Sequence, residues 1–129
     1  FRDFLRVHLS FEELGSLVAQ PAAHKDWVAA LSAVGGIYLI VDSMTGAQYV
    51  GSATGNGGIW QRWREYAKTG HGGNLRLHEL CRENIARASH FRFSILETFS
   101  RSMARDEAIR VESFFKQKLG TRVFGLNAN

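Results

Sequence analysis

Two short tripeptides, Gly36-Ile37-Tyr38 and Tyr49-Val50-Gly51, constrain the fold of this chain more than any other feature. The segment from Gly36 to Asp42 is rich in β-branched and aromatic residues, which favour strands, and this character resumes from Ala47 to Gly51. The four residues between them have the composition of a turn. The two segments therefore predict an antiparallel β-hairpin.

A four-residue loop would fix the pairing within this hairpin. With Asp42 opposite Ala47, counting along the strands places Tyr38 opposite Gly51. Because side chains alternate between the two faces, Tyr38 and Tyr49 are then diagonal neighbours on one face, and Gly51 leaves space beside Tyr38. A one-residue bulge would instead send the two tyrosines to opposite faces.

Hydrophobic periodicity predicts the remaining elements. Leu5, Val7 and Leu9 alternate with polar residues, which indicates a short strand with one exposed face. A capping box at Ser10 predicts a helix that ends before Pro21, and Asp26 is a candidate cap for a second helix. Later segments predict helices at 59–68, 75–88 and 103–119, a loop at 70–74, and a strand at 91–97.

Composition limits the class of protein. A chain of 129 residues with 45% apolar residues and one proline predicts a single globular domain with one core. The net charge of +4 favours a polyanionic partner. Because Cys81 is the only cysteine, an intramolecular disulfide is excluded, a cysteine-based metal site is disfavoured, and a reducing, cytoplasmic location is expected.

No membrane association is expected, since the longest apolar run, Ile37 to Val41, is too short to cross a bilayer and no signal-peptide pattern is present. The first residue is Phe rather than Met, so we expect a processed chain or, preferably, a domain of a longer protein.

Glu112 is an acid on the apolar side of the last predicted helix. Ala104, Ala108, Val111, Phe115 and Leu119 form the predicted buried stripe of that helix, and Glu112 falls inside it. A buried carboxylate is costly unless it is paired. Two interpretations stay open and are compatible: a salt bridge to a buried arginine such as Arg62, or a carboxylate that holds a divalent cation.

Arg62, the tyrosines and His71 each have a structural and a functional interpretation. Arg62 is either a solvated helix residue or a guanidinium that binds phosphate through two hydrogen bonds. Tyr38 and Tyr49 are either packing residues of the hairpin or site residues. His71 lies among glycines in a loop, as a surface histidine or as a proton carrier near the site.

In order along the chain, the two tripeptides, Arg62, Glu112 and Asn127 closely resemble the pattern of the GIY-YIG nuclease family. The second tripeptide is a common variant, and Tyr66 stands four residues after the arginine, where members carry histidine or tyrosine. The resemblance spans Val34 to Asn129. The 70–74 loop and the residues from 120 to 127 are similar to a bacterial-type branch of the family.

The resemblance implies an α/β (α+β) fold in which a small three-stranded antiparallel sheet is flanked by helices. Residues 34–129 would form this nuclease domain, and residues 1–33 would form an N-terminal strand and helical extension packed on it. The family's activity implies hydrolysis of DNA phosphodiester bonds in one step, with one Mg²⁺ or Mn²⁺ ion held by Glu112.

Family roles carried onto this chain make Tyr38 the general base, or an aid to the metal in activating the attacking water. A phenol has an ordinary pKa near 10, so Arg62 and the metal must stabilise its anion. By the same resemblance, Arg62 would also neutralise charge on the scissile phosphate. Tyr49 and Tyr66 would orient water or phosphate, Asn127 would hydrogen-bond within the site or support the tyrosines, and His71 has a counterpart in some members.

Two functions follow as hypotheses. The first is a metal-dependent DNA endonuclease, and the complete set of matching residues favours it. The second is a nucleic-acid-binding or targeting module that keeps the scaffold without the activity. The family includes homing, restriction, repair and phage-defence proteins, so the resemblance leaves the pathway, strand preference, choice of DNA or RNA and oligomeric state open.

Overall fold

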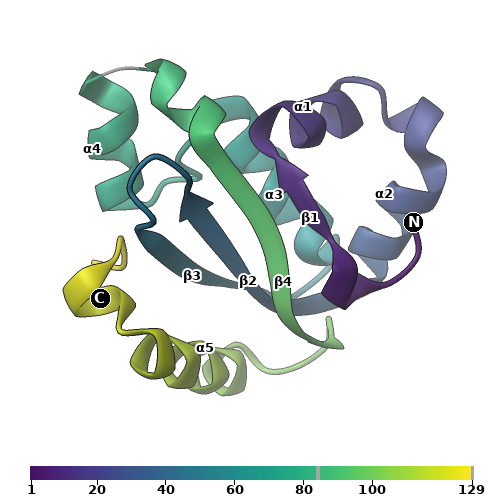
Figure 1. Ribbon diagram of the computed structural model, residues 1–129. Coiled ribbons are helices and arrows are strands. Elements are labelled where there is room, and N and C mark those ends of the chain that lie inside the picture. Colours follow the sequence, from purple (N-terminus) through teal and green to yellow (C-terminus); the bar gives the residue numbers. More distant parts are fainter. Residues whose placement is uncertain (84, 129) are drawn as a thin grey trace.

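The computed structural model describes residues 1–83 and 85–128. Its four-stranded antiparallel sheet has the strand order β1-β4-β2-β3, with helices on both faces (Figure 1). The described elements, in chain order, are η1 (Phe4–Arg6), β1 (His8–Ser10), α1 (Phe11–Ala19), η2 (Pro21–His24), α2 (Lys25–Ala33), β2 (Val34–Asp42), β3 (Gln48–Ala53), α3 (Gly58–Thr69), α4 (Leu75–Glu83), η3 (Ile85–His90), β4 (Phe91–Ser100), α5 (Arg105–Leu119) and α6 (Thr121–Phe124).

The hairpin of β2 and β3 has the predicted register. Tyr38 lies opposite Gly51, and the Asp42 N–H donates to the Ala47 carbonyl at 2.9 Å. A register shift between Ile37 and Tyr38 occurs on the other side of β2, against β4, so it leaves the hairpin pairing intact. The expected alternation of side chains therefore holds, and both tyrosines face α3.

Asp42 holds the hairpin turn from a fully buried position. Its carboxylate accepts hydrogen bonds from the Met44 N–H and the Thr45 hydroxyl, each at 3.0 Å, and forms an ion pair with Arg87 of η3. Donors around both oxygens compensate for burying the charge, and they tie the turn to a segment 45 residues later.

The N-terminal segment adds a strand to the three that the family resemblance implies. His8 of β1 pairs with Ser94 of β4, so β1 forms one edge of the sheet. The strand begins later than its alternating pattern predicts, because the Asp3 side chain accepts from the Leu5 N–H at 2.9 Å and starts a 3₁₀ turn. Leu5 is consequently exposed.

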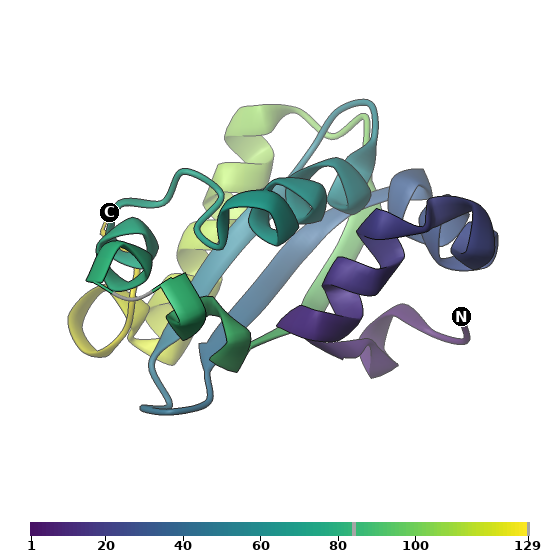
Figure 2. The same ribbon diagram turned by 90° about the horizontal axis from the view of Figure 1, so that it is seen from above.

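Helices α1, α2 and α3 cover one face of the sheet and α5 packs along β3 and β2 on the other. In Figure 2, α1 and α3 lie in front of the strands and α5 lies behind them. The capping box predicted at Ser10 is present at the start of α1. Asp26 does not cap α2; it lies in the first turn and pairs with the N-terminal amine at 2.6 Å.

The predicted helix at 75–88 passes through Asn84, which lies outside the described residues. On either side of it the structure has α4, which ends at Glu83, and the 3₁₀ helix η3. The short helix α6 was not predicted, because four residues are too few to show a period. Within the described part of the chain, no helix has the length and apolarity needed to cross a bilayer.

The buried stripe of α5 differs from the prediction. Ala108 is fully buried as expected, but Ala104 and Leu119 are exposed, and Lys116 is buried instead. Because α5 packs on β3 along one side only, its inward line runs through 108, 112 and 116, at the four-residue spacing of one helix face. Gly120, with φ of 65°, ends the helix where predicted.

A substitution at Gly51 tests the packing of the Tyr38 ring against β3 most directly. A Cβ atom at this position would lie 2.4 Å from both Cζ and Oη of the buried Tyr38 ring. We expect Gly51→Ala to lower the free energy of unfolding by about 1–3 kcal/mol through overpacking, as measured by chemical denaturation. Gly15→Ala is the control, because no heavy atom lies within 4 Å of its Cβ position. This helix substitution should be neutral or stabilising, and equal losses in both variants would contradict the packing argument.

Candidate active site

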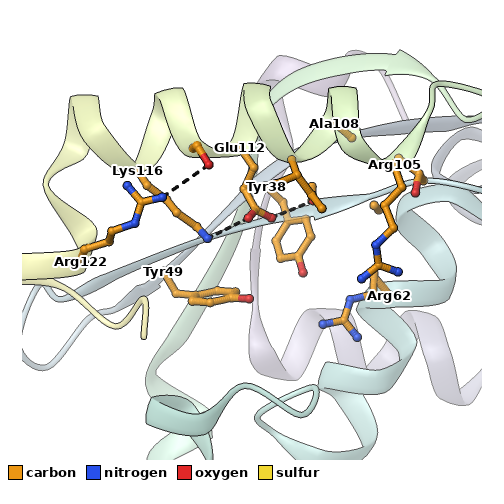
Figure 3. Close-up of a pocket in the computed structure, with 13 residues that line it drawn as sticks. Tyr38, Tyr49, Arg62, Arg105, Ala108, Glu112, Lys116 and Arg122 are labelled. Atoms are coloured by element: carbon orange, nitrogen blue, oxygen red, sulfur yellow. Dashed lines mark hydrogen bonds and ion pairs between the residues drawn. The ribbon is translucent and has the colours of Figure 1, made fainter. Parts of the chain in front are cut away.

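A cavity of about 730 Å³ lies beside the edge strand β3, between α3 and α5. Its walls include four of the predicted site residues, Tyr38, Tyr49, Arg62 and Glu112. They come from β2, β3, α3 and α5, respectively, and face a common space in Figure 3. The hairpin and two helices therefore bring together groups that are up to 74 positions apart in the sequence, counting from residue 38 to residue 112.

All three tyrosines of the chain meet beside this cavity. The Tyr38 ring centroid lies 6.5 Å from that of Tyr49 and 5.8 Å from that of Tyr66, and Tyr49 and Tyr66 are 6.5 Å apart. The Tyr38 and Tyr66 hydroxyls share a hydrogen bond of 2.9 Å. Because Gly51 has no side chain, the Tyr38 ring extends over β3, and its side chain reaches the cavity at the edge of the sheet.

Arg62 is held one helical turn from Tyr66. Its guanidinium donates to the Tyr66 hydroxyl at 3.4 Å and to the Gly72 carbonyl at 3.2 Å, and it forms an ion pair with Glu65. The arginine side chain is 32% exposed and lines the cavity. The structure thus favours a positioned cation at the cavity over a freely solvated helix residue.

Glu112 does not pair with Arg62, as one interpretation of the sequence had it. One carboxylate oxygen accepts from the Ser52 hydroxyl of β3 at 2.7 Å, and the other pairs with Lys116 Nζ at 2.8 Å (Figure 3). The glutamate side chain is 15% exposed, and that exposure is toward the cavity whose wall it forms. The acid is therefore partnered and still open to solutes.

The other three predicted residues lie outside the cavity lining. Tyr66 is fully buried behind Tyr38. Asn127 is 1% exposed, and its amide both donates to the Val50 carbonyl and accepts from the Val50 N–H, each at 2.8 Å. It thereby holds the outer edge of β3 next to Tyr49.

His71 lies in the loop that covers the Tyr66 ring. Its Nδ1 accepts from the Gly73 N–H at 2.9 Å, and its ring contacts that of His78, with centroids 4.5 Å apart. Burial, together with the neighbouring His78, lowers the pKa of His71, so a neutral imidazole is favoured. The adjoining Gly72 packs against Tyr66, where a Cβ atom would lie 2.6 Å from the ring.

A divalent cation of the Mg²⁺ type fits the donor set of this cavity. Mg²⁺ is commonly held by one or two carboxylates and keeps several waters, so one accessible carboxylate and a roomy cavity suffice. Glu112 supplies that carboxylate. Over residues 1–83 and 85–128, no group of three or more His, Cys, Asp or Glu side chains forms a closed metal cage, as transition-metal sites of the structural zinc type require.

Six further polar residues of the cavity were not predicted: Ser52, Thr54, Arg105, Ser113, Lys116 and Arg122. Lys116 was detectable, because it stands four residues after Glu112 and i,i+4 pairs of opposite charge meet on one helix face. The other five carry no local pattern. They become neighbours through the packing of α5 and α6 on β3.

The sequence model of the GIY-YIG catalytic domain matches residues 34–127. No curated protein sequence matches the chain. Among solved structures it is similar to the catalytic domain of the homing endonuclease I-TevI, with 26% sequence identity and a TM-score of 0.55, over 74% of this chain and 98% of that chain. A glutamate-to-alanine variant of the catalytic domain of the intron endonuclease I-TevI gives 25% identity and a TM-score of 0.57, over 74% and 94%.

These similarities agree with the order of the motifs and with the antiparallel sheet flanked by helices. The family match covers well over half of the sequence. The chain belongs to the GIY-YIG family of nuclease catalytic domains.

Proposed function

We propose that this protein is a metal-dependent endonuclease that hydrolyses phosphodiester bonds in DNA. The observation that supports it most is the meeting of two phenols, a guanidinium and an accessible carboxylate in one cavity. Phosphodiester hydrolysis needs a group that directs a water, a cation for the phosphate and a ligand for a metal, and these residues can supply all three.

Glu112 would hold the divalent ion, Mg²⁺ or Mn²⁺. When bound, such an ion supplies Lewis acidity, and it makes water more acidic. The Ser52 hydroxyl and Lys116 ammonium would fix the direction of the carboxylate, because each holds one of its oxygens. Arg62 would neutralise charge on the scissile phosphate from the opposite wall, with its own position set by Tyr66 and Gly72.

Tyr38 would take the proton from the attacking water. In the free protein its phenol is neutral, because burial raises the pKa well above the ordinary value of 10. Arg62 and the Tyr66 hydroxyl oppose that rise, since both can stabilise a phenolate. Tyr38 would therefore act as a base only after its own proton has passed to solvent, a loss that Arg62 and a cation held by Glu112 would favour by stabilising the phenolate.

The remaining residues would support this arrangement. Tyr49 would orient water or phosphate from the cavity wall, and Tyr66 would hold Tyr38 and Arg62. Asn127 would act through the strand that carries Tyr49. His71 would assist proton transfer as a neutral imidazole, although its place in the covering loop gives it the least direct access to the cavity.

Several broader features are part of the same proposal. The net charge of +4 suits DNA as the partner. We place the protein in the cytoplasm, in restriction, phage defence or DNA repair, and treat residues 1–33 as an extension packed on a nuclease domain of residues 34–129. Further domains of a longer chain would supply sequence specificity.

A second candidate is a binding module without hydrolytic activity. Two observations favour it: the Tyr38 phenol is fully buried, and the Glu112 carboxylate is already neutralised by Lys116. A folded protein that binds DNA but cuts no substrate with Mg²⁺ or Mn²⁺ would select this candidate over the nuclease.

Cleavage of supercoiled plasmid DNA with Mg²⁺ or Mn²⁺ tests the main proposal. We expect Glu112→Ala and Arg62→Ala each to lower the rate of nicking by at least about 10²-fold, because each removes a group that stabilises the transition state. Glu107→Ala is the matched control, an exposed acid on the same helix. Circular dichroism should show that all three variants are folded. Unchanged cleavage by Glu112→Ala would reject the metal site.

Alkaline titration tests the state of the tyrosines. Because burial raises the pKa of Tyr38 and of Tyr66, we expect neither to ionise near pH 10 in the folded protein, whereas free phenols do. The near-ultraviolet absorbance of tyrosinate should thus rise together with unfolding. Between the unfolded and folded pKa values the folded state holds more protons, so stability should fall as pH rises above about 10. Tyr66→Phe should weaken that fall.

The Asn127→Ala variant distinguishes a structural role of the Asn127 amide from a direct role in cleavage. The change leaves the buried edge of Val50 without either hydrogen bond, so we expect the free energy of unfolding to fall by about 2–4 kcal/mol. Cleavage should decline because Tyr49 is displaced. Denaturant melts should show the loss. An Asn127→Ala protein of unchanged stability with abolished cleavage would instead assign the amide a direct role.

A further inference from the structure

Lys116 is an unusual residue for the wall of a metal site. It is only 4% exposed, and its ammonium lies 2.8 Å from Glu112, the one carboxylate that the proposed function assigns to the metal. Lysine is rarely buried, and an apolar residue in its place would often cost the fold less. A buried lysine at this position of α5 therefore favours a role in the site over a role in packing.

The charges that line the cavity around Lys116 are mostly positive. Among the described lining residues, Arg62, Arg105, Lys116 and Arg122 are cationic, and Glu112 is the only acid. Figure 3 places Lys116 and Arg122 on one side of the glutamate and the other two arginines on the opposite side. Glu65 offsets part of the charge of Arg62 from outside the lining. A free divalent cation thus meets a positive cavity whose carboxylate already has a cation on one oxygen.

A DNA strand changes this balance, because it brings phosphate charges into the same cavity. Each phosphate gives the ammonium of Lys116 and the three guanidinium groups an alternative anionic partner. The carboxylate of Glu112 can then accept a divalent ion with less competition and less repulsion.

We propose that Lys116 couples metal binding to DNA binding, so that Glu112 holds a divalent ion weakly in the free protein and strongly once DNA phosphate is present. The inference rests on the proposed function, since it assumes that Glu112 is the metal ligand. Coupling between two ligands is reciprocal, so the metal should tighten DNA binding by the same factor.

Direct measurement of Mn²⁺ binding tests the proposal. Free Mn²⁺ is followed by electron paramagnetic resonance with and without a short DNA duplex, and every protein carries Tyr38→Phe so that the duplex stays intact. We expect the duplex to raise the affinity of the parent for Mn²⁺ by about tenfold or more, within the usual range of coupling. Without DNA, Lys116→Met should bind Mn²⁺ about tenfold more tightly than the parent, and the effect of the duplex should shrink.

Two matched variants separate this coupling from simple structural support. Lys118→Met removes the same charge from an exposed position on α5 and should leave both affinities unchanged. Lys116→Gln keeps a hydrogen-bond donor beside Glu112 without the charge, and it should behave like Lys116→Met. If thermal melting shows that the methionine variant does not fold, the glutamine variant decides the test. Mn²⁺ affinity that is equal or weaker in the folded Lys116 variants would overturn the proposal.

The failure of the proposed function itself would look different. In that case Glu112→Gln in the same background would bind Mn²⁺ as well as the parent does, with or without DNA. The affinity for the duplex, measured by fluorescence anisotropy with and without Mn²⁺, gives the reciprocal readout. In the parent it should change by the same factor as the Mn²⁺ affinity.

Discussion

The close approach of the Tyr38 ring to Gly51 is the contact on which the site depends. A phenol on the inner strand β2 can reach the cavity because the edge strand beside it presents a bare backbone at this point. That one contact sets the place of the Tyr38 hydroxyl, and the hydroxyl in turn positions Tyr66, which holds Arg62. The pairing of β2 with β3 thus sets the position of site residues on α3 as well.

The sequence was sufficient to predict the features that residues close together in the chain determine. Turn composition and alternation gave the register of Tyr38 with Gly51, the capping box gave the start of α1, and Gly120 gave the end of α5. The order of the motifs also identified the four predicted residues that line the cavity. The signals for the register and for the two helix ends lie within a few positions of the residues they concern, whereas the order of the motifs spans residues 36–127 and was interpreted through the family resemblance.

Features set by distant packing could not be predicted in this way. The fourth strand forms because β1 pairs with the free edge of β4, 86 residues later in the chain (from His8 to Ser94). The buried face of α5 is set by where β3 lies, so helical spacing alone misplaced it. Asp26 was assigned to a helix cap, but the N-terminal amine, a partner 25 residues away, engages it instead.

The two hydrogen bonds between Asn127 and the Val50 backbone have a consequence for the newly made chain. The amide occupies the outward-facing backbone groups of the edge strand β3, which would otherwise be open to another strand. A polypeptide still on the ribosome has released its tyrosine hairpin long before residue 127 emerges. Until Asn127 is in place, the backbone groups of Val50 stay open to another strand, so this contact protects the sheet edge against aggregation.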